Sequence, residues 1–221
     1  MMPQVVTCPT AASAANLAPF VIDEAGLEQG QDQFSRFGFA VLGPAALTNE
    51  AIQQLRAEAA KQRNAASWPL RYGDARSQVP EANVRGHFGP SARGFLSGDS
   101  VLRLMQTITG QAVSPSWSAS CYTWYDIPGA WLGRHLDKQD ACFLTMLVGL
   151  ESHWPADSTP PPGNQLWIYD SFLASRPLFR ITTLVNRITI LDGKRWPHER
   201  RPVQEGQHAS VLCACFRAAE L

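Results

Sequence analysis

The pattern of the second half of the chain constrains the fold most. From about residue 111, apolar, β-branched and aromatic runs alternate with clusters of Pro, Gly and Asp, which is typical of short strands joined by turns. The predicted strands cover residues 118–125, 141–150, 165–169, 179–185, 187–191 and 209–216. The break at 153–163 contains three successive prolines, which cannot donate to a strand ladder. The pattern predicts a β-sandwich or barrel.

The first half is mixed. Residues 20–23 and 38–42 resemble short strands, and helical patterns run from Thr48 to about residue 62 and over 101–109. Residues 67–95 are rich in Arg, Gly, Pro and Ser without a period, which predicts a long loop. At 221 residues the chain suits one domain. We expect a flexible arm at 1–18 and one domain at 19–221, with a helical and strand lead-in over 19–110 and a β core over 111–221.

The charge balance narrows the partners. Lys and Arg total 19 and Asp and Glu total 19, so the bulk electrostatics favour neither a nucleic acid nor an anionic membrane. No apolar run is long enough for a bilayer, so we expect no membrane association. We therefore predict a small-molecule substrate and a monomer or homodimer. The five cysteines lie mostly in apolar runs, where free thiols act as small hydrophobes, and this predicts a reducing, cytoplasmic location.

One short motif carries chemistry. His135-Leu136-Asp137 lies in a strand-like stretch, where side chains at i and i+2 point to the same face and can reach one metal ion. A third ligand, His198, follows about sixty residues later, after the strand that ends near Leu191. Two imidazoles and one carboxylate on one side of a divalent ion leave the other positions open. This arrangement suits iron(II) that must bind substrate and dioxygen, and it disfavours structural zinc with four protein ligands.

The order of these parts resembles a known family. The stretch from Tyr125 through His135 and Asp137, the apolar run 143–150, the Asn186-Arg187 strand and the distal His198 resemble the iron(II)/2-oxoglutarate-dependent dioxygenase superfamily, in its prolyl-hydroxylase-like branch. The resemblance covers roughly residues 100–217. It implies a mainly β fold with N-terminal helices around a double-stranded β-helix, the jelly-roll core of cupin-like proteins. It also implies Fe(II) at the three ligands, 2-oxoglutarate as co-substrate, O2 as oxidant and Tyr125 in the co-substrate pocket.

The sequence departs from the family at the co-substrate carboxylate. Members of the family usually hold it with an Arg about ten residues beyond the distal His, followed by a small residue. Here the corresponding region reads Gly206-Gln207-His208-Ala209-Ser210 and contains no Arg. One explanation is that protonated His208 binds the carboxylate with Ser210; another is that Arg187 or Arg217 replaces the missing cation. A third is that the enzyme does not use 2-oxoglutarate.

The resemblance implies an oxidoreductase, an Fe(II)/2-oxoglutarate-dependent dioxygenase that couples 2-oxoglutarate decarboxylation to hydroxylation, desaturation or oxidative cyclisation of a small molecule. The alternatives are a 2-oxoglutarate-independent iron oxidase and a non-catalytic, cupin-like metal-binding module. The arginines of the predicted loop either face water or grip an anionic substrate above the metal, and in the second case the loop would act as a lid. They are Arg71, Arg76, Arg85 and Arg93.

Overall fold

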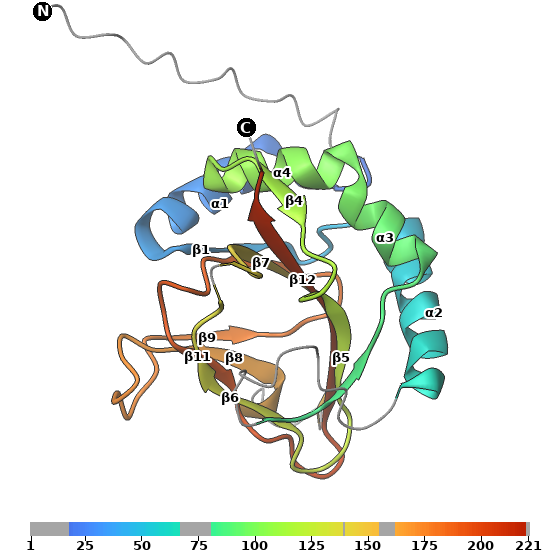
Figure 1. Cartoon of the computed structure of the whole chain (residues 1–221), viewed down its shortest axis with the longest axis vertical. Coiled ribbons are helices and arrows are strands. Elements are labelled where there is room, and N and C mark those ends of the chain that lie inside the picture. Colours follow the sequence, from blue (N-terminus) through green and yellow to red (C-terminus); the bar gives the residue numbers. More distant parts are fainter. Residues whose placement is uncertain (1–17, 67–80, 139, 155–161, 220–221) are drawn as a thin grey trace, which may run out of the picture.

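Two antiparallel sheets face each other, and helices cover the outer face of the larger one (Figure 1). The structure, a computed structural model, describes residues 18–66, 81–138, 140–154 and 162–219. Within these ranges the larger sheet has seven strands in the order β1-β10-β7-β12-β5-β3, with β4 paired to β12, and the smaller has the order β2-β6-β11-β8-β9. No helix in the described ranges is long and apolar enough to cross a bilayer.

The strands of the larger sheet are β1 (Phe39–Leu42), β3 (Val84–Gly86), β4 (Val113–Pro115), β5 (Cys121–Tyr125), β7 (Leu144–His153), β10 (Ile188–Leu191) and β12 (His208–Ala218). Those of the smaller sheet are β2 (Glu81–Ala82), β6 (Trp131–His135), β8 (Gln165–Ile168), β9 (Phe179–Thr182) and β11 (His198–Arg200). Helices are α1 (Glu24–Phe37), α2 (Asn49–Ala65), α3 (Pro90–Ser97) and α4 (Asp99–Thr109), with a short 3-10 turn, η2 (Pro162–Asn164), before β8.

Capping residues determine where the longer helices begin and end. Asp23 accepts a hydrogen bond from the backbone N–H of Gly26 at the start of α1, and Thr48 accepts one from Ala51 at the start of α2. α1 and α4 end at Gly38 and Gly110, whose φ angles of 70° and 71° lie in the left-handed region that favours glycine.

The main hydrophobic core lies between the helices and the larger sheet. Alternate residues of β12, such as Leu212, Ala214 and Phe216, face this core together with Leu104 of α4 and Tyr122 of β5. The opposite face of β12 and β5 is turned to the space between the two sheets. The clusters of buried apolar residues in that space are smaller than the main core. That interior therefore has room for polar side chains, and the candidate site lies there.

The strands predicted after residue 111 and the helices predicted near Thr48 and over 101–109 are confirmed. The mainly β class with N-terminal helices is also confirmed. The predicted strand at 20–23 is wrong, because only an isolated bridge joins Phe20 to Leu47 and α1 begins directly after Asp23. Of the loop predicted at 67–95, residues 67–80 lie outside the described residues. The rest is wrong as a loop, since it forms β2, β3 and α3.

The expectation of five free thiols is also wrong. Cys142, just before β7, and Cys215 of β12 form a disulfide. Cys121 and Cys213, which are register partners on β5 and β12, form no disulfide; Cys121 is buried and Cys213 is half-buried. The cytoplasmic location stays a prediction.

Candidate metal centre and the barrel interior

The two histidines of the predicted triad lie opposite each other on neighbouring strands. His135 ends β6 and His198 begins β11, and their Cα atoms are register partners. Asp137 follows two residues beyond His135, and its Oδ1 lies 3.6 Å from the Nε2 of each histidine. One ligand atom from each residue can be chosen so that all lie within 4.8 Å of one another. The structure thus brings together the three residues that the sequence predicts as metal ligands.

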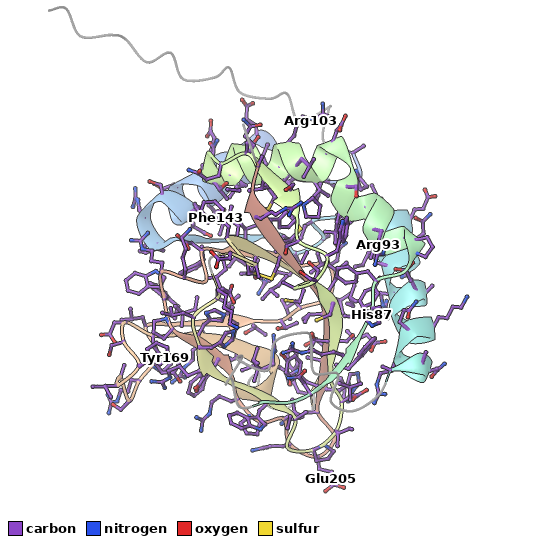
Figure 2. The ribbon with its side chains drawn as sticks, in the orientation of Figure 1. His87, Arg93, Arg103, Phe143, Tyr169 and Glu205 are labelled. Atoms are coloured by element: carbon purple, nitrogen blue, oxygen red, sulfur yellow. A yellow bond between two sulfur atoms is a disulfide. The ribbon has the colours of Figure 1, made fainter. Side chains whose placement is uncertain are left out.

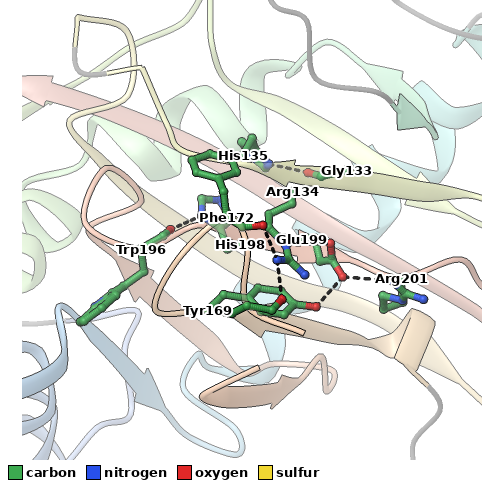
Figure 3. A network of polar contacts seen from close by, with 10 residues as sticks. Gly133, Arg134, His135, Tyr169, Phe172, Trp196, His198, Glu199 and Arg201 are labelled. Carbon is green, nitrogen blue, oxygen red and sulfur yellow. Dashed lines mark hydrogen bonds and ion pairs between the residues drawn. The ribbon is translucent and has the colours of Figure 1, made fainter. Parts of the chain in front are cut away.

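Backbone carbonyls orient both imidazoles (Figure 3). The His135 Nδ1 lies 2.8 Å from the Gly133 carbonyl oxygen, and the His198 Nδ1 lies 3.0 Å from that of Trp196. Because a carbonyl only accepts, each Nδ1 carries the proton in the neutral ring and donates it, which leaves the Nε2 lone pair directed at the cluster. This is the tautomer that a metal ligand needs.

Hydrogen bonds hold Asp137 through both its side chain and its backbone. The Thr145 hydroxyl donates to its Oδ2 at 2.6 Å, and the Asp137 backbone N–H donates to the Gly193 carbonyl at 2.9 Å. A Cβ built on Gly193 would overlap this carboxylate, so the turn after β10 can approach it only because residue 193 has no side chain. Thr145 also lies 3.0 Å from the Cys142 sulfur, which places the disulfide one side chain away from Asp137.

The protonation states also suit a divalent metal. Burial, together with the neighbouring His135, lowers the pKa of His198 to about 4, although the Asp137 carboxylate acts in the opposite direction. Burial acts to raise the pKa of Asp137, but the electrostatic effect of the nearby His198 and His135 imidazoles and the hydrogen bond from the Thr145 hydroxyl outweigh it and lower this pKa to about 2. At neutral pH the cluster therefore has a neutral imidazole at His198 and a carboxylate at Asp137, as metal ligands require.

The opposite face of β6 and β11 carries a polar network (Figure 3). Arg134 points away from the metal ligands, as strand alternation predicts, and its guanidinium lies 3.4 Å from the centre of the Tyr169 ring and pairs with Glu199 at 3.4 Å. Arg134 also donates to the carbonyls of Phe172 and Ala174. The residue next to His135 thus braces the loop that follows β8.

The residues predicted to hold the co-substrate divide between two faces of the larger sheet. Tyr125 faces the interior, is 3% exposed, and packs with Ala130, Val203 and Val211. Ser210 faces the other way, where its hydroxyl donates to Glu151 at 3.3 Å in a surface pocket against α2.

His208 begins β12, and its ring stacks on that of His153 with the centroids 5.3 Å apart. Arg187 lines a small cavity between the sheets, and its buried Nε has no hydrogen-bond partner. Arg217 is exposed and donates to Ser114. Of the residues proposed for the carboxylate, the structure therefore brings only Arg187 to the interior.

Sequence reasoning missed Arg200, the second residue after His198. Arg200 is 3% exposed and lines the same cavity as Arg187. Its guanidinium donates to the Gly163 carbonyl at 3.1 Å and to the Thr183 hydroxyl at 2.7 Å, and lies 4.7 Å from the centre of the Tyr125 ring. The signal was present, because residues i and i+2 of a strand share a face.

The predicted grip of loop arginines above the metal is wrong for Arg93. This residue lies on the helical side of the molecule, whereas Tyr169 lies on the side of the smaller sheet (Figure 2). Its guanidinium is 5.2 Å from the Trp117 ring, and it donates to the Phe88 carbonyl. Arg85, on β3, donates to Asn83. Arg71 and Arg76 lie outside the described residues.

Comparison with known proteins supports the fold. No protein-family model matches the sequence, and no curated protein matches it. Among solved structures, a prolyl-4-hydroxylase from Pseudomonas putida superposes with a TM-score of 0.62 at 20% identity, over 88% of this chain and 100% of that one. The chain has the fold of the 2-oxoglutarate-dependent iron(II) oxygenases. The expected double-stranded β-helix is thereby confirmed.

Two further structures have this fold. A prolyl hydroxylase from Trichoplax adhaerens, solved with a peptide of hypoxia inducible factor, has a TM-score of 0.66 at 16% identity, over 87% of this chain and 89% of that one. The epimerase SnoN of nogalamycin biosynthesis, described as non-heme and alpha ketoglutarate dependent, has a TM-score of 0.66 at 14% identity, over 89% of this chain and 82% of that one.

Proposed function

We propose that the protein is an Fe(II)/2-oxoglutarate-dependent dioxygenase that hydroxylates, desaturates or cyclises a small molecule. The observation that carries the proposal is the cluster of His135, Asp137 and His198, whose ligand atoms lie within 4.8 Å of one another in a double-stranded β-helix. Three protein ligands on one side leave positions for a chelating co-substrate and for O2. Structures with this fold include SnoN bound to Fe3+ and alpha ketoglutarate, which supports the same pair of cofactors here.

The residues of this chain would hold and orient these groups. His135 and His198 present Nε2 because their Nδ1 atoms are fixed on carbonyls, and Asp137 presents Oδ1 because Thr145 occupies its Oδ2. Bound iron, 2-oxoglutarate and O2 would supply the oxidising power for a C–H bond. The task of the protein is then to place the substrate carbon beside the metal and to keep other groups away.

Two apolar side chains on the outer side of this region are exposed. Leu136, between two of the ligands in sequence, is 38% exposed, and Phe172 of the loop braced by Arg134 is 53% exposed. Exposed apolar side chains are typical of interaction surfaces, so apolar molecules are included among the test substrates. Because Arg93 packs on Trp117, the described residues support an anionic substrate less than the sequence did.

The experiment is co-substrate turnover by the iron-loaded protein. Protein reconstituted with Fe(II) without oxygen is exposed to O2 with 2-oxoglutarate and a panel of apolar small molecules and short proline-containing peptides. Succinate formation and O2 uptake are followed together. We expect both to require 2-oxoglutarate and to increase with an accepted substrate. The Asp137→Ala variant, measured in parallel, is the control for metal-independent oxidation.

The outcomes separate the alternatives. O2 uptake that needs iron and substrate but no 2-oxoglutarate would identify a 2-oxoglutarate-independent oxidase. Bound metal without O2 uptake or succinate across the panel would identify a non-catalytic metal-binding module. Either result contradicts the proposal.

A further inference from the structure

Arg200 is a buried cation without a buried anion. Within the described part of the chain it pairs with no carboxylate, and its hydrogen bonds end on the neutral oxygens of Gly163 and Thr183. A guanidinium stays charged and has five N–H donors, so its burial without a counter-charge is costly. Its neighbours on the chain behave differently, because Glu199 and Arg201 face outward and pair with each other. An anionic ligand in the interior would compensate this charge.

The position of Arg200 relative to the metal ligands suits a short dicarboxylate. Arg200 and His198 share one face of β11 and lie two positions apart, or roughly 6.6 Å along the strand. Across the interior, β12 and β5 place Ala209 beside Tyr125 and Val211 beside Thr123. Cys213 follows two positions after Val211 on β12, and the charges of Asp137 and Arg200 both affect the pKa of its thiol. His198, Arg200 and Tyr125 therefore all face the space between the two sheets.

We infer that Arg200 binds the far carboxylate of the 2-oxoacid co-substrate, and that the cation of this subsite comes from β11 instead of β12. The inference rests on the proposed function, in which the metal binds the keto-acid end. Tyr125 lines the same subsite, because its ring lies 4.7 Å from the Arg200 guanidinium. The fork of N–H groups on Arg200 can hold a carboxylate through paired, charge-assisted hydrogen bonds.

The other residues proposed for the carboxylate fit this role less well. Ser210 lies on the outer face of the larger sheet, and His208 stacks on His153 at the strand end, so neither faces Tyr125. Arg187 shares the cavity with Arg200. However, Arg187 lies just before β10, which pairs with β7, and its guanidinium donates to the Thr182 carbonyl. Arg200 alone among these candidates follows a metal ligand on the same face of the same strand.

The test measures binding without turnover. Two 2-oxoacids are titrated by calorimetry into protein loaded with Mn(II): 2-oxoglutarate and 2-oxopentanoate, which has the same chain length and a methyl group in place of the far carboxylate. The wild type should bind 2-oxoglutarate more tightly by roughly 10- to 150-fold, the range expected for hydrogen bonds to a charged group. In Arg200→Met this preference should disappear, while the affinity for 2-oxopentanoate stays the same. Arg200→Lys should retain part of it.

The matched control is Arg201→Met, which removes a neighbouring, outward-facing arginine and should keep the wild-type preference. A preference that survives in Arg200→Met, or disappears in Arg187→Met instead, overturns the assignment of Arg200 and leaves the proposed function intact. A wild type that loads metal but binds both acids equally overturns the assignment without any variant. A loaded wild type that binds neither acid contradicts the proposed function, and the assignment with it.

Discussion

Gly193 offers a sharp test of the metal centre, because a substitution there acts on Asp137 without replacing any of the three ligands. The Cβ of an alanine at this position would overlap the Asp137 carboxylate. The backbone N–H of Asp137 donates to the Gly193 carbonyl at 2.9 Å, so the two segments cannot separate without losing this bond. The φ angle of Gly193 lies outside the left-handed region, so alanine meets no backbone strain there. The effect of Gly193→Ala is therefore steric and is directed at one ligand.

We expect Gly193→Ala to weaken metal binding by about 10- to 100-fold, the usual cost of disturbing the groups that orient a ligand. This loss corresponds to about 1.4–2.8 kcal/mol. The assay is the dissociation constant for Mn(II), with urea unfolding of the metal-free protein to measure the cost of overpacking separately. Gly94→Ala is the control, because a Cβ at Gly94 meets no atom within 4 Å. Wild-type affinity in Gly193→Ala would show that Asp137 does not hold the metal in the arrangement described.

Three further predictions follow from the same contacts. Asp137→Ala should abolish stoichiometric Mn(II) binding with the far-ultraviolet circular dichroism unchanged, since two imidazoles remain. Asn186→Ala should lower the free energy of unfolding in urea by about 2–4 kcal/mol, because Asn186 both accepts from the Leu47 N–H and donates to its carbonyl at 2.8 Å in a buried site. The folded pKa of His198, about 4, lies below its ordinary value of 6.5, so the unfolded chain takes up this proton first. The metal-free protein should therefore lose up to about 3 kcal/mol of stability between pH 6.5 and 4, and urea unfolding of His198→Gln should lack this loss.

The strands of the second half could be predicted because each is a short apolar run between turn residues. Two helices of the first half could not. α1 buries only Leu27 and Gly30, so its apolar period is weak, and its start depends on the cap at Asp23. α3 is eight residues long and has the Arg, Gly and Ser composition of a loop. The helix becomes stable through packing of Ala92 and Leu96, which propensity does not show.

In the site too, features set by neighbouring residues could be predicted, whereas contacts between segments far apart in the sequence could not. The pair His135 and Asp137 could be predicted from alternation alone, and His198 from the order of the family's parts. The contacts of Asp137 with Thr145 and Gly193 could not, because they join segments that only the folded sheets bring together. The Cys142–Cys215 disulfide was missed for the same reason, since its residues are 73 positions apart.

Arg200 was missed although alternation on β11 was sufficient to find it. The family pattern predicts this cation on β12, but the interior-facing residues of β12 near Tyr125 are the small Ala209 and Val211. Small side chains on one sheet leave volume that a long side chain from the opposite sheet can fill, and Arg200 lines a cavity together with Val211. When two sheets face the same interior, a strand of either sheet can therefore supply a cation to the same place in it. The absence of a cation on β12 therefore does not show that the subsite lacks one, because a facing residue of β11 can supply it.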